Sequence, residues 1–192
     1  MATAVHTVSV DDLVAGLHEF PESAFDEIEP IRKFLQRMPV ATDSLAPYLC
    51  WNSQHYTRNL IDSTPLYELM AICWEVGQSS SIHNHHNQNC WMAVPMGRLL
   101  VENFHTLHQD ITGGKCDIRA FETVEMNISA PCAVSPKDPV HRVFNPHHFN
   151  QRAVSLHVYS RPFDRCVVYS ADKGTCGEIQ LHFTTKFGKP NN

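Results

Sequence analysis

The sequence predicts a mainly β fold, a barrel of the jelly-roll type with α-helices in front of it. Short runs rich in Val, Ile, Leu, Tyr and Phe recur after residue 48, separated by Gly, Pro, Asn and Asp. This pattern is typical of a β-sandwich or barrel. Residues 1–45 carry helical signals instead, and no repeat or linker interrupts the 192 residues. We therefore expect one domain over 1–192, helical over about 1–45 and a β-barrel over 46–192.

Two helices are expected before the barrel. Ser9 precedes the segment VDDLVAGLHEF, and a serine followed by acidic residues in the first turn is a good N-cap. The segment AFDEIEPIRKFLQRM, residues 24–38, is the second candidate. Pro30 lies within it and is expected to interrupt the helix, because proline lacks a backbone N–H.

The barrel strands are expected where the apolar runs lie. The turn sequence ITGGKC predicts a hairpin between two of them. The expected strands cover 55–61, 67–76, 90–96, 98–104, 118–126, 141–145, 152–159, 165–170 and 178–187.

Composition and charge exclude several classes of protein. A net charge of −5 without a basic run argues against a nucleic-acid-binding protein. The N-terminus lacks the pattern of a signal peptide, and no apolar run approaches the ~20 residues of a membrane helix. We expect a soluble, cytoplasmic monomer, since no large exposed apolar stripe stands out. Seven cysteines without a CxxC pair predict reduced thiols rather than a zinc knuckle.

A histidine pair is the strongest chemical signal. His83 and His85 are two residues apart, so on a strand both side chains project to one face, while His86 points away. Two imidazoles rarely suffice for a metal site. His141, with Val140 beside it, is the expected third ligand from another strand.

The spacings around these histidines resemble the two cupin motifs. The segment GQSSSIHNHHNQNCWMAVPMG, residues 77–97, resembles the first motif, with Cys90 where most cupins carry a glutamate ligand. The segment PKDPVHRVFN, residues 136–145, resembles the second, with Asp138 in place of the usual glycine. Without the carboxylate, a divalent metal keeps a net charge of about +2 and favours an anionic bidentate substrate such as a thiolate.

Two further strands carry polar residues suited to a substrate. Tyr56 and Arg58 share one strand face, and the planar guanidinium suits a carboxylate. Ser155, His157 and Tyr159 also share a face, and the alternating apolar residues between them need burial too. We interpret this row as a hydrogen-bond relay lining a pocket rather than an exposed polar stripe.

The ordered segments YTRN, SSIHNH, HRV, AVSLHVYS and HFTTKFG, with a cysteine five residues after the second histidine, resemble animal-type cysteine dioxygenase, a thiol dioxygenase of the cupin superfamily. The likeness runs from Tyr56 to Gly188. It implies that His83, His85 and His141 bind one Fe²⁺. The implied reaction adds both atoms of O2 to the thiol of L-cysteine and gives cysteine sulfinate, a step of cysteine catabolism and taurine biosynthesis.

The resemblance also implies roles for the remaining candidates. Cys90 and Tyr159 would form a thioether, the 3′-(S-cysteinyl)-tyrosine crosslink, and Arg58 would hold the cysteine carboxylate. Tyr56 and His157 would support the substrate and the phenol. The last member of the set, which would fix the His157 ring, is Ser155.

Three positions depart from the family pattern. Asn84 replaces the aspartate of the usual HDH, which removes a charge behind the ligands. Arg161 replaces a common proline, so the expected cis serine–proline bond cannot form as such, and the arginine is expected either to alter the pocket wall or to place another cation near the substrate. Trp91 stands beside the crosslink cysteine.

Other functions stay open from the sequence. Another small carboxylated thiol, such as 3-mercaptopropionate, is the first alternative, although Arg58 and Cys90 favour cysteine. A cupin isomerase or hydratase using Zn²⁺ or Mn²⁺ is the second, because three histidines suit zinc equally well. A metal-free binding module is the third, and it would leave buried imidazoles without partners.

Overall fold

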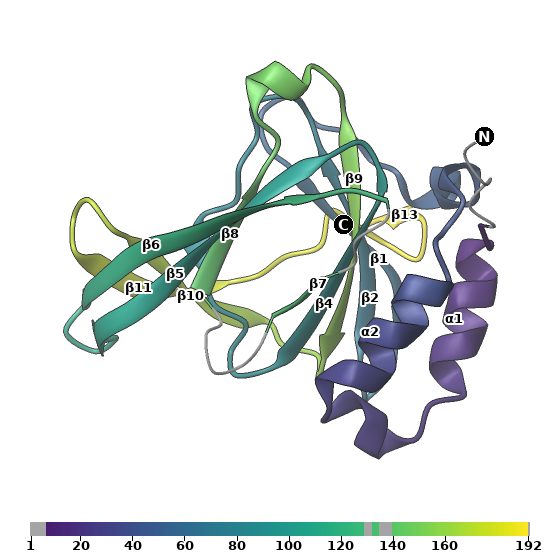
Figure 1. Ribbon diagram of the computed structural model, residues 1–192, viewed down its shortest axis with the longest axis horizontal. Coiled ribbons are helices and arrows are strands. Elements are labelled where there is room, and N and C mark those ends of the chain that lie inside the picture. The colour runs from purple at the N-terminus through teal and green to yellow at the C-terminus, as the bar shows by residue number, and fades with distance from the viewer. Residues whose placement is uncertain (1–6, 129–131, 135–139, 192) are drawn as a thin grey trace.

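The computed structural model describes residues 7–128, 132–134 and 140–191. Two β-sheets make up most of the fold, and the N-terminal helices lie against one of them (Figure 1). The predicted mainly β fold with helices at the N-terminus is confirmed. Within the described residues, no helix is both long and apolar enough to span a membrane.

The helices are α1 (Val10–His18) and α2 (Ile28–Arg37), with 3-10 helices η1 (Glu22–Phe25), η2 (Thr42–Tyr48) and η3 (His147–Phe149). Ser9 caps α1 as predicted: its Oγ accepts from the Asp12 N–H at 3.1 Å. The expected interruption at Pro30 is wrong. Pro30 lies in the first turn of α2, where backbone N–H groups have no acceptor within the helix, so proline removes no bond.

Every predicted strand region contains a strand. The strands are β1 (Thr57–Ser63), β2 (Glu68–Trp74), β3 (Ile82–His83), β4 (Asn89–Met96), β5 (Leu99–Asp110), β6 (Lys115–Met126), β7 (Cys132–Val134), β8 (Val140–Phe144), β9 (Ala153–Ser160), β10 (Arg165–Ser170), β11 (Thr175–Gln180), β12 (Thr185–Lys186) and β13 (Lys189–Pro190). The apolar runs did not predict β7 and β13, because two or three residues are too few to establish an alternation, and β3 was expected only from the spacing of His83 and His85. The predicted hairpin at 111–116 joins β5 to β6.

The strands form two sheets. One has seven strands in the order β13-β12-β1-β2-β9-β4-β7. The other closes on itself in the order β10-β11-β6-β5-β8-β3. The hairpins β5–β6 and β10–β11 extend away from the helices, at the left of Figure 1. The helices lie against one face of the open sheet, at the right of Figure 1.

The central strands of the open sheet are buried on both faces. β2 and β9 are buried at every position. One face of these strands packs under the helices, in a cluster that includes Leu69, Leu156 and Val158. The opposite face belongs to a second cluster, which includes Ile72, Trp74 and Tyr159. Full burial explains why these strands have no exposed polar face.

The segment after β9 corrects the expectation for Arg161. The peptide between Ser160 and Arg161 is cis although no proline is present. Arg161 keeps a backbone N–H, which donates to Gln88 Oε1 at 2.6 Å. Its guanidinium lies 2.6 Å from Glu22 of η1 rather than in the pocket with the histidines, so the expected cation near the substrate is wrong.

Candidate metal centre

Three histidines converge where β3 and β8 of the closed sheet pair. His83 on β3 pairs directly with His141 on β8, and His85 follows two residues after His83. Their ligand atoms all lie within 4.8 Å of one another. His86 is exposed with a φ of 51°, so it points away as predicted. The strand itself ends at His83, which makes the turn after it, rather than strand alternation, responsible for placing His85.

Several buried nitrogens of this cluster have no hydrogen-bond partner among the described residues. His85 Nδ1 and Nε2 and His141 Nδ1 are buried without a hydrogen bond among the described residues. Burial, followed by repulsion from neighbouring histidines, holds the pKa of His85 and His141 well below the usual value. Burial also lowers the pKa of His83. Neutral imidazoles with unshared lone pairs are the donors that a divalent transition metal requires.

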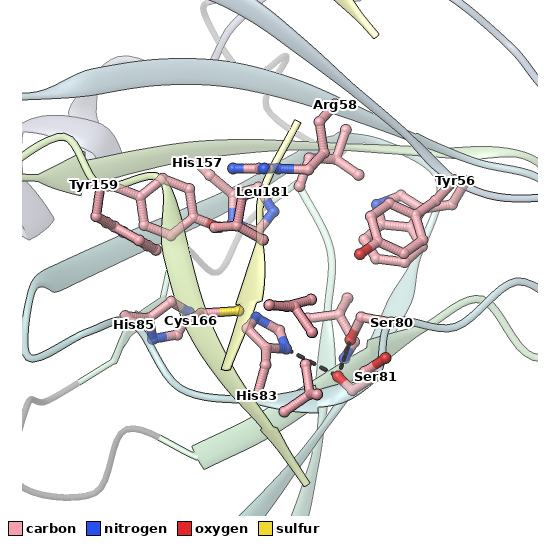
Figure 2. Close-up of a pocket in the computed structure, with 16 residues that line it drawn as sticks. Tyr56, Arg58, Ser80, Ser81, His83, His85, His157, Tyr159, Cys166 and Leu181 are labelled. Carbon is pink, nitrogen blue, oxygen red and sulfur yellow. Dashed lines mark hydrogen bonds between the residues drawn. The ribbon is translucent and has the colours of Figure 1, made fainter. Parts of the chain in front are cut away.

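Backbone contacts orient the first ligand. His83 Nδ1 lies 2.9 Å from the Ser81 carbonyl, which leaves Nε2 to face the cluster (Figure 2). Asn84 points the other way: its Oδ1 accepts from the Val167 N–H at 3.0 Å, and its Nδ2 donates to the Tyr169 hydroxyl at 3.3 Å. The asparagine therefore ties the ligand segment to β10 through neutral hydrogen bonds.

A cavity of about 60 Å³ lies beside the histidines. Figure 2 shows Arg58, His157 and Tyr159 along one side of it and His83 and His85 along the other. Tyr56, Ser80, Ser81, Cys166 and Leu181 also line it. The predicted common face of Tyr56 and Arg58 and that of the relay residues thus open onto the same space.

The relay is continuous. Ser155 Oγ lies 2.8 Å from His157 Nε2, and the Tyr159 hydroxyl lies 3.0 Å from His157 Nδ1. Burial, then repulsion by His83 and Arg58, lowers the pKa of His157 to about 3, so its ring is neutral at physiological pH. Burial raises the pKa of Tyr159 well above its usual value, and the Cys90 thiol adds to this effect.

Cys90 and Tyr159 are direct partners across β4 and β9. Both belong to the cluster on the inner face of the sheet, and Cys90 is fully buried. Side chains of directly opposed residues have Cβ atoms about 4.5–5.5 Å apart. The two predicted partners of the thioether are therefore neighbours.

Arg58 presents its guanidinium to the cavity. Its Nη1 donates to the His182 carbonyl at 3.3 Å, and its guanidinium carbon lies 5.2 Å from the centre of the Phe183 ring. No described carboxylate lies within the 4 Å of an ion pair, so the charge is available to an anionic ligand. Tyr56 stacks on Trp74 with ring centres 4.7 Å apart.

Comparison with known proteins agrees with this geometry. The family described as "Cysteine dioxygenase type I" matches residues 1–172. Cysteine dioxygenase type 1 of Rattus norvegicus is 31% identical over 179 residues, which cover 92% of this chain and 86% of the relative. The Homo sapiens protein of the same name is 30% identical over the same shares of the two chains.

The chain belongs to the cysteine dioxygenase type I family.

Solved structures give partial likenesses. A double-stranded β-helix protein from Klebsiella pneumoniae aligns with a TM-score of 0.46 and 13% identity, covering 72% of this chain and 95% of that one. An RmlC-like cupin from Desulfovibrio desulfuricans aligns with a TM-score of 0.43 and 12% identity, covering 60% and 91%.

Some site residues of this cysteine dioxygenase family member escape the sequence reasoning. Trp74 and Cys166 line the cavity, but each stands in an apolar run that reads as core. Trp74 has a usable signal, because a buried indole N–H needs an acceptor. Glu68 is only 8% exposed, and its Oε2 is buried without a partner. The sequence signal for Glu68 is its place at the start of an otherwise apolar strand, where a charged residue is unexpected.

Part of the second cupin motif cannot be compared with the structure. Pro136 and Asp138 lie outside the described residues. Asn145, the last residue of that motif, is fully buried. Its Nδ2 donates to the Gln151 carbonyl at 2.8 Å and contacts the Trp74 carbonyl at 3.4 Å. Asn145 thus connects the segment after His141 with the end of β2.

Proposed function

We propose that this protein oxidises the thiol of L-cysteine with O2 to cysteine sulfinate at a ferrous ion held by His83, His85 and His141. One observation carries the proposal. Three imidazoles converge, and nitrogens of His85 and His141 are buried without a hydrogen bond among the described residues. Two of the three, His83 and His85, line a cavity with Arg58, which no described carboxylate pairs. A metal cation would satisfy these nitrogens, and the donor set fits a divalent transition metal.

Ferrous iron bound there would supply coordination positions for a thiolate and the electron exchange that O2 requires. The overall reaction, R–SH + O2 → R–SO2H, balances without an external reductant because sulfur provides the electrons. The protein's own part is to bind, orient and shield the reactants. The apolar members of the cavity wall, Ile72, Val143, Phe163 and Leu181, limit access of water.

Arg58 is proposed to hold the carboxylate of the substrate. The planar guanidinium can donate two parallel hydrogen bonds to a carboxylate, and a small cavity strengthens this attraction. Tyr56 lies on the same side and is proposed to support the bound acid group. Its stacking on Trp74 fixes the phenol ring against the sheet.

Tyr159 is proposed to present its hydroxyl to the reacting groups, with His157 and Ser155 fixing its orientation. The two hydrogen bonds of this row, at 2.8 and 3.0 Å, and the burial of its members support the role. Cys90 and Tyr159 are proposed to form the thioether crosslink. The new bond joins Sγ to the ring carbon beside the hydroxyl, and the two hydrogens removed leave with two electrons that O2 accepts. The link would lock the phenol in place.

The decisive experiment loads the protein with Fe²⁺ anaerobically, adds a thiol and then admits O2. Cysteine, 3-mercaptopropionate and cysteamine form the panel, with sulfinate and oxygen uptake as the two readouts. We expect one O2 consumed per sulfinate, and faster turnover of cysteine than of cysteamine, which lacks the carboxylate. Cysteine turnover no better than that of cysteamine would contradict the role of Arg58, and faster 3-mercaptopropionate turnover would favour the alternative substrate.

Some expectations remain predictions. The assignment of 1–192 to one domain, the monomeric state and the cytoplasmic location belong to this group. Sedimentation of the purified protein would settle the oligomeric state.

A further inference from the structure

The row of hydrogen bonds that ends at Tyr159 has one more member than the sequence indicates, Trp74 on β2. The Trp74 indole Nε1 donates to Ser155 Oγ at 2.9 Å. This bond precedes the contacts of Ser155 with His157 and of His157 with Tyr159. All four residues are at least 95% buried, so water cannot easily replace a missing partner.

The tryptophan gives the row a direction. An indole N–H can only donate, so Ser155 Oγ must accept at this contact. If His157 also donated its Nε2–H to Ser155, the serine proton would have no acceptor among the hydrogen bonds of the described residues. A fully buried hydroxyl proton without an acceptor is unfavourable. The serine therefore donates to His157 Nε2.

We propose that Trp74 is a positioning residue that selects the Nδ1–H tautomer of His157 through Ser155, and thereby turns the Tyr159 hydroxyl proton towards the cavity. The steps follow from one another. Because Nε2 accepts from serine, a neutral His157 carries its proton on Nδ1. That N–H donates to the Tyr159 oxygen, so the phenol keeps its own proton free for a group in the cavity.

The opposite direction would have a different outcome. With Nε2 protonated, Nδ1 would accept the phenol proton, and Tyr159 would offer only a lone pair to the cavity. The tautomer thus decides whether Tyr159 is a donor or an acceptor towards a bound anion. The use of that donor in catalysis rests on the function proposed above, whereas the tautomer itself does not.

A matched control exists in the same sheet. Trp91 is fully buried, and its indole N–H donates to the Ile28 carbonyl, also at 2.9 Å. This bond lies under the helices, on the face of the sheet that is turned away from the cavity. Trp91→Phe therefore removes the same kind of hydrogen bond without touching the relay.

The test is ¹⁵N NMR of the metal-free protein with ring-labelled histidine. His157 is assigned by the loss of its signals in His157→Gln. In the wild type we expect Nδ1 protonated and Nε2 unprotonated. In Trp74→Phe the tautomer ratio should shift about twofold or more towards Nε2–H, because the serine loses the indole donor that strengthens its own hydrogen bond to His157. Trp91→Phe should leave the ratio unchanged.

A second variant guards against a packing defect. A benzothienyl analogue of tryptophan at position 74 keeps the ring shape and lacks the N–H, and it should shift the tautomer as Trp74→Phe does. In a Ser155→Ala background, Trp74→Phe should cause no further shift, because the tryptophan acts through the serine. A wild-type Nε2–H tautomer, or an unchanged ratio in the analogue variant, would overturn the inference.

Kinetics provide a separate readout. In the iron-loaded protein, Trp74→Phe should lower kcat for cysteine by about the same factor as the tautomer shift, while KM changes less, because the carboxylate contact at Arg58 is intact. If the tautomer shifts as expected but no thiol is oxidised by the wild type, the proposed function fails and the inference about Trp74 stands.

Discussion

The two faces of β9 are equally buried but have opposite chemistry. Val154, Leu156 and Val158 pack under the helices, whereas Ser155, His157 and Tyr159 face the other sheet. The apolar face contributes stability by removing surface from water. The polar face can be buried only because each member bonds the next. Equal burial therefore serves packing on one face and a directed hydrogen-bond row on the other.

The two tryptophans repeat this contrast. Trp91 donates to a backbone carbonyl of α2 and so attaches a helix to the sheet. Trp74 donates to a side chain whose own proton must then go elsewhere. A backbone carbonyl only accepts, so the chain of hydrogen bonds ends there. A hydroxyl that accepts can also donate its own proton to the next residue. The difference lies in the acceptor and not in the tryptophan.

The largest expected effect tests whether the histidines that face the polar side of β9 form a metal site. His85→Ala should lower thiol oxidation at least about 1000-fold and abolish stoichiometric iron binding, because one of three ligands is lost. His86→Ala is the control, since that side chain is exposed one residue away. Iron content and oxygen uptake are the measurements. Similar losses in both variants would show that His85 does not bind the metal through its buried position.

The next effect concerns recognition of the substrate carboxylate by Arg58 in the cavity. Arg58→Ala should weaken the binding of cysteine by about 2–5 kcal/mol, the loss of a buried charge-assisted contact. The change should be seen mainly in KM, and cysteamine, which has no carboxylate, should be much less affected. Steady-state oxygen uptake with both thiols measures this. An equal loss for the two substrates would mean that Arg58 acts on folding or on the metal site.

The outer face should respond in stability only. Leu156→Ala creates a cavity under the helices and should lower the free energy of unfolding by about 2–5 kcal/mol. The His157 tautomer should not change, because the side chain points away from the relay. Chemical denaturation and the NMR signals of His157 are the two measurements. A shifted His157 tautomer in this variant would contradict the claim that the two faces of β9 act independently.

The smallest effect concerns Glu68, near Arg58, whose Oε2 is buried without a hydrogen bond among the described residues. Burial raises its pKa above the ordinary 4.5, while Arg58 and Lys186 lower it and Asp164 raises it. A raised folded-state pKa means that ionisation costs stability. This cost is fully present above the folded-state pKa and disappears below pH 4.5, the ordinary pKa.

Glu68→Gln should therefore raise Tm by about 2 °C at pH 7, and the gain should shrink as the pH falls towards 4.5. Glu178→Gln, at an exposed carboxylate on β11, is the comparison variant. Thermal unfolding at the two pH values provides the test. A gain that grows on acidification would contradict the assigned sign.

Much of the fold could be read from local patterns. The N-cap at Ser9, the long strands and the hairpin at 111–116 depend on neighbouring residues and were predicted correctly. Pro30 was misread because the effect of a proline depends on where the helix begins, and η1 takes the residues that would otherwise extend it. Arg161 was misplaced because the acids that attract it lie 139 and 135 positions earlier in the chain.

By itself, the sequence determined the ligand types and their local spacing: His83 and His85 two apart, Arg58 after Tyr56, and the alternating row from Ser155 to Tyr159. The shared face of the row from Ser155 to Tyr159 follows from strand periodicity, whereas the turn after His83 places His85. Only the tertiary structure decided what lies opposite them. It paired His83 with His141, set Cys90 against Tyr159 and brought the Trp74 N–H to Ser155. Register between distant strands is a property of the closed fold, because every face must fit the others at once.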